Sequence, residues 1–482
     1  MSCNALFPYA SKATLAHMLC GKSLAEVPTP AAVINVAAAR RNCERMLEAC
    51  DELDLGWRAH VKTHKTAELT RLQVGSNGSR PVNIVVSTMA EAEFLQPLLL
   101  EYKSQGRGVN VLYGLPFASN ALERFGALGR ALGQDSISIL IDDPEQLPVA
   151  LALKEACGVV PHAYIKVDMG GRRAGVVVGS RRYRELVDAA LDAHTQGAIR
   201  LWGLYTHAGH SYGGSSPAAA MRMLGQEVDA MLQGADDIKA SAETRAVANM
   251  GPLVISAGAS PTALSVQNMI EDSKGASGQS DGECLGEAAS LAKLLGEVRR
   301  RGHSRVEVHA GVYATLDLQQ LAAHSMASSR LSWRDMAFTV LAQVHSIYPG
   351  RGAQGLPEVL IGAGGLALAR EPCKAYDGMA MVTPWGRDGA AMPVGNVQDF
   401  EGWIVGRLAQ EHGILTWQWS KDRKQDTDLP GKQMVEVGQK IRLWPNHACI
   451  TGSHFGCYLI VDEDDAGNGD KIIDVWPRAR GW

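Results

Sequence analysis

The sequence predicts an α/β fold in which a (β/α)8 barrel is followed by a smaller, antiparallel β domain. Between about residue 56 and residue 315, short β-branched apolar runs alternate with longer helix-compatible stretches, which is typical of βα units around a parallel sheet. After about Arg330 most segments favour β-structure and clear helices are few. The count of eight runs favours a closed barrel, although an open doubly wound sheet fits the alternation almost as well.

Composition indicates an ordinary two-domain globular protein. A chain of 482 residues is too long for one compact core. With 46% hydrophobic residues and a formal net charge of -4, it lacks the basic excess of a general nucleic-acid binder, and no apolar run is long enough to span a membrane. Nine scattered cysteines without a secretory segment indicate a reducing compartment, so we expect a cytoplasmic protein.

Eight apolar runs are the predicted barrel strands. They cover residues 56–62, 82–87, 109–114, 136–142, 162–168, 201–209, 253–258 and 306–311. Several of them end on polar side chains, namely Lys62, Asp142, Asp168, His207, Ser256 and His309. Because the carboxyl ends of barrel strands meet at one mouth, this placement suits the rim of an active site.

The predicted domain boundaries follow from the change in pattern along the chain. We expect an N-terminal extension at residues 1–27, the barrel at 28–325 and a β-rich domain at 326–482. Residues 264–301, between the last two barrel strands, have a Gly/Ser-rich centre followed by a helical pattern. That length predicts a surface insertion with a mobile tip.

The second domain is predicted to be antiparallel. Strands are expected at residues 337–348, 359–368, 440–444, 457–462 and 471–476. Residues 465–470 (DAGNGD) have the composition of a hairpin turn between the last two of these strands. An early apolar run at residues 31–36, followed by a helical stretch at 37–53, is compatible with membership of the same sheet.

The segment from Arg58 to Lys65 (RAHVKTHK) carries the strongest local signal for catalysis. Alternation along a strand places Arg58, His60 and Lys62 on one face. If that face is the barrel interior, burial lowers the lysine pKa and makes the amine a nucleophile for carbonyls. A lysine at a strand end is otherwise a solvated surface residue, so this segment alone leaves both interpretations open.

His447 and Cys449 form a second candidate site. Their i, i+2 spacing places both side chains on one face of an extended segment, where they could share a metal ion. Zinc usually takes three or four protein ligands, so the spacing alone leaves a purely structural role open.

The lysine segment resembles the pyridoxal phosphate motif of the D-serine dehydratase and D-threonine aldolase group, fold-type III enzymes related to alanine racemase. Further motifs match in the same order along the chain from about residue 28 to its end. They are Pro28–Pro30 (PTP), Lys166–Gly175 (KVDMGGRRAG), Gly203–Tyr212 (GLYTHAGHSY), Ser256–Thr262 (SAGASPT), Glu307–Tyr313 (EVHAGVY) and Pro445–Cys449 (PNHAC). The insertion after Thr262 is the main departure.

The resemblance implies a pyridoxal phosphate site in the barrel. Lys62 is expected to carry the cofactor, and Arg173 to hydrogen-bond its phenolic oxygen. His207 is expected to stack on the pyridine ring. Tyr205 and Tyr313, in the matching segments, are assigned to the same site. Without the resemblance, Arg173 is equally compatible with a surface salt bridge and His207 with the barrel core.

The phosphate group needs backbone N–H groups and hydroxyls that can approach closely. Small residues after the last two barrel strands supply that chemistry, and barrels commonly bind phosphate there. The candidate phosphate contacts are Gly258, Ser260, Thr262, Gly311 and Val312. Ser256, at the strand end, is a further candidate contact with the cofactor. Glycine and serine at such turns are otherwise simply turn formers.

His309 is expected to face the pyridine nitrogen, where the racemase relatives have an arginine. A weaker or neutral partner leaves the protonation of that nitrogen uncertain, so stabilisation of the carbanion would rely more on help to the leaving group. The resemblance provides such help, because D-serine dehydratases place zinc at the positions of His447 and Cys449. A thiolate selects zinc over harder ions, whereas related D-threonine aldolases tend to have an acid at the position of Cys449.

The activity that the resemblance implies is zinc-assisted β-elimination of a D-β-hydroxy amino acid, which converts D-serine to pyruvate and ammonia and could extend to D-threonine. The alternative is retro-aldol cleavage by the same cofactor with a divalent metal. A homodimer is expected from the family, with a small D-amino acid as the substrate and neither nucleic acid nor membrane as a partner.

Overall fold

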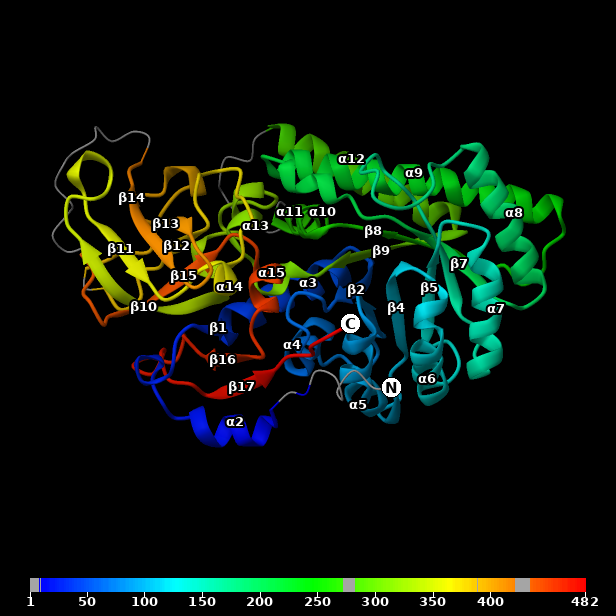
Figure 1. Ribbon diagram of the computed structural model, residues 1–482. Helices are drawn as coiled ribbons and strands as arrows, with labels where there is room; N and C mark the ends of the chain where they lie inside the picture. The colour runs from blue at the N-terminus through cyan, green and yellow to red at the C-terminus, as the bar shows by residue number, and fades with distance from the viewer. Residues whose placement is uncertain (1–7, 9, 272–281, 388, 421–433) are drawn as a thin grey trace. The chain divides into compact units, whose positions relative to one another are not determined.

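The computed structural model describes residues 8, 10–271, 282–387, 389–420 and 434–482 (Figure 1). These residues form two compact units. The first contains Glu44–Gly311 and Ala479–Trp482, and the second contains the described part of Tyr9–Cys43 together with Val312–Arg478. Within the first unit, eight parallel strands of the described chain close into a barrel in the order β2 to β9, so the closed barrel is confirmed over the open sheet.

The barrel strands coincide with the eight predicted runs. They are β2 Gly56–His60, β3 Val82–Val86, β4 Val109–Pro116, β5 Ile137–Ile141, β6 His162–Lys166, β7 Arg200–Tyr205, β8 Leu253–Ala257 and β9 Ser304–Ala310. Most of them are shorter than predicted. Lys62, Asp142, Asp168 and His207 lie beyond the ends of their strands, on connecting loops where side chains can reach a ligand, whereas Ser256 and His309 lie within β8 and β9.

Helices follow the strands and surround the barrel (Figure 1). They are α4 Ala67–Val74, α5 Met89–Ser104, α6 Leu122–Leu132, α7 Gln146–Cys157, α8 Arg181–Thr195 and α9 Pro217–Thr244. Several begin at a hydroxyl cap: Thr66 accepts a hydrogen bond from the Leu69 N–H and Ser216 from the Ala219 N–H. Such caps satisfy backbone donors that the first helical turn leaves open.

The connection from β8 to β9 is largely helical. It contains α10 Ser260–Leu264, α11 Asn268–Glu271 and α12 Gly282–Arg301. Helix α12 buries Leu291, Leu295 and Val298 and lies beside α9 (Figure 1). The helical half of the expected insertion is therefore a crossover helix of the barrel itself. The expected mobile tip, at residues 272–281, lies outside the described residues.

The barrel interior combines an apolar belt with polar layers. Val85, Leu112, Leu140, Tyr164, Tyr205 and Val254 form one buried cluster. Inward-facing polar residues continue beyond this cluster toward both ends, because alternate residues of each strand point into the barrel.

The second unit is built on one sheet, nine-stranded over the described residues, in the order β11-β14-β13-β12-β15-β10-β1-β16-β17. Its strands are β1 Ala31–Asn35, β10 Phe338–Tyr348, β11 Glu358–Ile361, β12 Ala380–Val382, β13 Gly402–Leu408, β14 Gly413–Gln418, β15 Lys440–Pro445, β16 Cys457–Val461 and β17 Asp474–Pro477. Among these strands, the pairings are antiparallel except that β1 runs parallel to β16. The early strand belongs to this sheet, as the sequence allowed, and helix α3 (Val36–Glu52) follows it.

Parts of this sheet differ from the prediction. Residues 359–368 were expected to form one strand, but β11 ends at Ile361 and the short helix α14 (Gly365–Leu368) follows. Strands β12, β13 and β14 were not predicted. The hairpin signal is confirmed, because β16 and β17 pair on either side of it. Helices α2 (Lys12–Leu19), α13 (Leu318–Ala323) and α15 (Ala448–Ser453) complete the unit.

No helix within the described ranges combines the length and the apolar character that a membrane crossing requires.

Candidate active site

Lys62 lies directly beyond the carboxyl end of β2. The strand ends at His60, and the Lys65 N–H donates a 2.8 Å hydrogen bond to the Val61 carbonyl, which closes a turn. The predicted continuation of strand alternation to Lys62 is therefore wrong. The side chain is half-buried, and its ammonium group makes no hydrogen bond or ion pair with the described residues. An amine in this position is available for a carbonyl group.

Three histidines lie near this turn: His60 and His309 are buried, and His207 is partly buried. Burial first, and the positive charge of Lys62 next, lower the pKa of His60 and of His207 well below the ordinary value. Burial also lowers the pKa of His309, followed by the charges of Lys166 and Arg58, while the Gly258 carbonyl opposes the shift. All three imidazoles are consequently neutral at physiological pH.

His309 stands out because one of its ring nitrogens has no partner. Its imidazole stacks on Tyr205 with ring centroids 4.2 Å apart, and Nδ1 lies 3.1 Å from the hydroxyl of Ser256. Nε2 is buried and has no hydrogen-bond partner among the described residues. A buried polar atom without a partner costs free energy, so this atom is a candidate contact for a ligand.

Gly258 shapes the loop after β8. Its φ of +135° is a conformation that L side chains rarely adopt, and a Cβ atom would lie 2.6 Å from the His309 carbonyl oxygen. The Gly258 carbonyl is 3.0 Å from Nδ1 of His207, which therefore carries a proton and donates. Glycine is thus required for the backbone to pass this close to the two histidines.

The other predicted phosphate contacts lie close by in the chain. Ser260 and Thr262 are buried at the start of α10, and the Thr262 hydroxyl accepts a 2.9 Å hydrogen bond from the Ala259 N–H. Gly311 follows β9, and a Cβ there would lie 3.1 Å from the His60 carbonyl. The division between the two units falls after Gly311, so Val312 and Tyr313 begin the second unit.

Two ionisable residues of the site were missed by the sequence analysis. Lys166, at the end of β6, lies 4.5 Å from the centre of the Tyr205 ring, and burial with the charge of Arg173 lowers its pKa to about 7. Glu227, on α9, accepts a 3.1 Å hydrogen bond from the Gly258 N–H, and burial raises its pKa to about 7. Lys166 begins a motif quoted for the resemblance. Glu227 gave no signal, because it lies within a long helix.

Arg173 is exposed on the loop between β6 and α8. The carboxylate of Asp168 holds this loop, because it accepts hydrogen bonds from the N–H groups of Gly170 and Arg172. The charge of Arg173 contributes to the lowered pKa of both Lys166 and His207, which places it near the carboxyl end of the barrel.

The candidate metal pair belongs to the second unit. His447 precedes α15, and its Nδ1 lies 3.2 Å from a carboxylate oxygen of Glu371. Burial alone would lower the pKa of His447, but Cys449, Asp317 and Glu371 raise it to about 10. Acidic side chains therefore lie close to His447. No group of three or more His, Cys, Asp and Glu side chains in the described part of the chain is arranged to enclose a metal ion.

A βα barrel with a lysine directly after its first strand, followed by a β-rich second unit, defines a class of protein: the alanine-racemase-like enzymes of fold type III. The family model of the alanine racemase N-terminal domain matches residues 34–272, and that of the putative serine dehydratase domain matches residues 337–461.

Individual relatives narrow the class. A D-serine dehydratase from Schizosaccharomyces pombe is 34% identical over 96% of this chain and 94% of its own length. A D-serine dehydratase from Saccharomyces cerevisiae is 30% identical over 96% of this chain and 98% of its own. The solved structure of D-threo-3-hydroxyaspartate dehydratase from Delftia sp. HT23 superposes with a TM-score of 0.68 at 26% identity, covering 96% of this chain and 100% of that one.

The chain belongs to the D-serine dehydratase family, a family of pyridoxal phosphate-dependent lyases. The barrel residues fit that cofactor, because His309 presents a buried nitrogen with no hydrogen-bond partner among the described residues. Lys62 would hold the cofactor covalently.

Proposed function

We propose that this protein is a D-serine dehydratase, which converts D-serine to pyruvate and ammonia with pyridoxal phosphate on Lys62 and zinc on His447 and Cys449. The donor set around His447 carries the choice of reaction. A thiol beside an imidazole favours zinc over harder ions. Zinc is a Lewis acid, and a Lewis acid suits a reaction in which a hydroxyl group must leave.

The names of the relatives support the same choice. The S. pombe and S. cerevisiae proteins are named D-serine dehydratases. One solved structure of a D-threo-3-hydroxyaspartate dehydratase is a cysteine-to-alanine mutant in the metal-free form. The pairing of a cysteine substitution with a metal-free form supports the proposal that Cys449 is a metal ligand here.

Lys62 has two roles in the proposed reaction. It would hold the cofactor until the substrate amine takes its place, and its free Nζ would then remove the proton from Cα. The cofactor supplies an electron sink for the resulting negative charge. Because Lys62 is a base on one side of the site, a D-substrate presents its Cα proton to it and the L-isomer does not.

Other residues would orient the reactants. The neutral imidazole of His207, fixed by its hydrogen bond to the Gly258 carbonyl, would lie against the pyridine ring. Gly258, Ser260, Thr262, Gly311 and Val312 remain the predicted phosphate contacts, and Tyr205 and Tyr313 remain predicted contacts with the cofactor. Arg173 would bind the phenolic oxygen. Zinc on His447 and Cys449 would supply Lewis acidity at the β-hydroxyl, and Glu371 would orient His447 through Nδ1.

Product analysis by NMR tests the reaction type. Holoenzyme loaded with pyridoxal phosphate and zinc is incubated separately with D-serine and D-threonine. The proposal predicts pyruvate from D-serine and 2-oxobutyrate from D-threonine. Glycine and acetaldehyde from D-threonine would instead establish the aldolase alternative. Sedimentation of the same sample tests the proposed homodimer, and fractionation of cells tests the proposed cytoplasmic location.

Chelation tests the zinc role separately. Treatment with EDTA is expected to abolish dehydration of D-serine, and added zinc to restore it. Cys449→Ser should lower both zinc content and activity at least tenfold. Cys457→Ser, which changes a partly buried cysteine in β16, is the matched control and should retain both. Full activity of a zinc-free protein would contradict the Lewis-acid role.

A further inference from the structure

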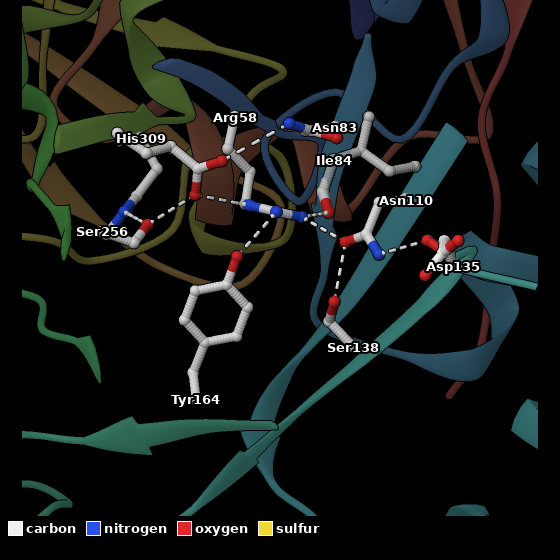
Figure 2. A network of polar contacts seen from close by, with 10 residues as sticks. Arg58, Asn83, Ile84, Asn110, Asp135, Ser138, Tyr164, Ser256 and His309 are labelled. Atoms are coloured by element: carbon white, nitrogen blue, oxygen red, sulfur yellow. Dashed lines mark hydrogen bonds and ion pairs between the residues drawn. The ribbon is translucent and has the colours of Figure 1, made fainter. Parts of the chain in front are cut away.

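A chain of buried hydrogen bonds crosses the barrel and ends at His309 (Figure 2). It begins at Arg58, whose Nε donates to Oε1 of Glu307 at 2.7 Å. Oε1 also accepts from the Ser256 hydroxyl at 2.8 Å, and the oxygen of Ser256 lies 3.1 Å from Nδ1 of His309. All four side chains are at least nine-tenths buried. We call Arg58, Glu307, Ser256 and His309 the relay.

Arg58 is the first residue of the relay, and further hydrogen bonds hold its guanidinium in place. Its guanidinium also donates to Oδ1 of Asn110 at 2.9 Å and to the Tyr164 hydroxyl at 3.1 Å. Burial by itself lowers the pKa of Arg58, but the charges and hydrogen bonds of Glu307 and Tyr164 together more than offset this, so the pKa lies above its ordinary value. Arg58 is therefore a permanent cation that holds Glu307 as an ionised acceptor.

The direction of each proton follows from this ion pair. An ionised carboxylate only accepts hydrogen bonds, so the single proton of the Ser256 hydroxyl must point to Glu307. The oxygen of Ser256 then has only lone pairs for His309. Nδ1 of His309 must therefore carry the imidazole proton. Because this imidazole is neutral, Nε2 is left with a lone pair and no proton.

Nε2 is the atom of His309 that has no partner among the described residues. A buried acceptor of this kind is satisfied by a donor and not by another lone pair. If His309 faces the pyridine nitrogen of the bound cofactor, as the family resemblance implies, that donor would be the N–H of a protonated pyridine ring.

We propose that Arg58, Glu307 and Ser256 are positioning residues that fix His309 as a hydrogen-bond acceptor, and that the pyridine nitrogen of bound pyridoxal phosphate is therefore protonated. This inference rests on the proposed function. It goes beyond it, because an uncharged histidine by itself leaves the protonation of the nitrogen open. A protonated pyridine ring withdraws more electron density, so the relay would strengthen the electron sink without placing a positive side chain beside the pyridine nitrogen.

The test measures the pyridine nitrogen directly. Holoenzyme is prepared with pyridoxal phosphate labelled with 15N in the ring, and the 15N chemical shift is recorded by solid-state NMR. The relay predicts the upfield shift of a protonated pyridine nitrogen in the wild-type protein. A downfield shift, typical of an unprotonated nitrogen, would overturn the proposal without any variant.

Two substitutions separate positioning from packing. Ser256→Ala removes the acceptor of the Nδ1 proton and should move the 15N signal downfield. Ser256→Thr keeps the hydroxyl and should restore the wild-type shift. Ser138→Ala is the matched control, because Ser138 is also buried but donates to Asn110 and has no contact with His309. A Ser256→Ala signal identical to that of the wild type would contradict the relay.

The outcome also distinguishes this inference from the proposed function. If the protein takes up no labelled cofactor, the proposed cofactor site fails. If the cofactor binds and its nitrogen is unprotonated, the site stands and the relay fails.

Discussion

The two ends of the barrel differ in whether their polar and charged side chains have partners. At the amino end, Arg58 pairs with Glu307 and Arg80 pairs with Asp51. These four residues line a cavity of about 720 Å³. At the carboxyl end, the ammonium of Lys62 and Nε2 of His309 have no hydrogen-bond partner among the described residues. The barrel therefore keeps its reactive groups at one end, and the size of a cavity does not locate them.

Removal of the reactive amine should have the largest effect. Lys62→Ala is expected to lower kcat for D-serine by about a thousandfold or more, because it removes the proposed nucleophile and base. Steady-state kinetics with a saturating level of cofactor measures the effect. Lys103→Ala is the control from the amino end, where the ammonium contacts the Leu132 carbonyl, and it should keep kcat within about twofold. Equal losses of kcat in both variants would contradict the proposed difference between the two ends of the barrel.

The paired charges at the amino end should matter for stability instead. Arg58→Met leaves Glu307 buried without its cation and should cost about 3–5 kcal/mol of unfolding free energy. Arg80→Ala removes a pair whose aspartate is 62% exposed and should cost less than about 1 kcal/mol. Thermal unfolding of both variants measures the difference. Comparable small losses would mean that the buried pair is not a stabilising element.

Gly258 should be intolerant of a side chain. Gly258→Ala places a Cβ 2.6 Å from the His309 carbonyl oxygen at a φ of +135°. Strain of about 1–3 kcal/mol is expected, with weaker binding of pyridoxal phosphate measured by fluorescence titration. Gly302→Ala is the control: it also has a positive φ, +70°, but nothing lies within 4 Å of its Cβ. Unchanged cofactor affinity in Gly258→Ala would contradict the predicted phosphate contact at Gly258.

The last prediction concerns the pH dependence of stability. Burial lowers the pKa of Lys166 from 10.5 to about 7, so between these values the unfolded chain binds more protons than the folded protein. Lys166 therefore destabilises the fold below pH 7, and this penalty is relieved as the pH rises to 10.5, with a slope of at most about 1.4 kcal/mol per pH unit. Lys166→Met should raise the thermal midpoint most at pH 7, and the gain should shrink toward pH 10. A gain in thermal midpoint that grows with pH would contradict this prediction.

Much of the fold could be predicted because it follows from local pattern. Apolar runs of β-branched residues, each followed by a helix, determine the barrel, and residues 465–470 mark the hairpin between β16 and β17. Strands β12 to β14 were missed. The three residues of β12 are too few for a periodic signal, whereas β13 (GWIVGRL) and β14 (GILTWQ) do contain β-prone residues and were overlooked.

The site was less predictable, because its contacts join distant parts of the sequence. Glu307 and Ser256 are 51 residues apart, and Arg58 is 249 residues from Glu307. A single sequence does not reveal such pairs. The alternation of side chains along a strand did predict that Arg58 and His60 share a face. The same prediction was wrong for Lys62, because the strand ends at His60. Gly258 and His309 were found through the resemblance, whereas Glu227 had no signal at all.

The most direct test of the account asks which lysine holds the cofactor. Lys62 and Lys166 both lie at the carboxyl end of the barrel, and the lowered pKa of Lys166 also makes its amine a competent nucleophile. The holoenzyme is reduced with borohydride, digested and mapped by mass spectrometry. The account predicts a phosphopyridoxyl group on Lys62 and none on Lys166. A label on Lys166, or no label on either lysine, would contradict the assignment of the reactive amine.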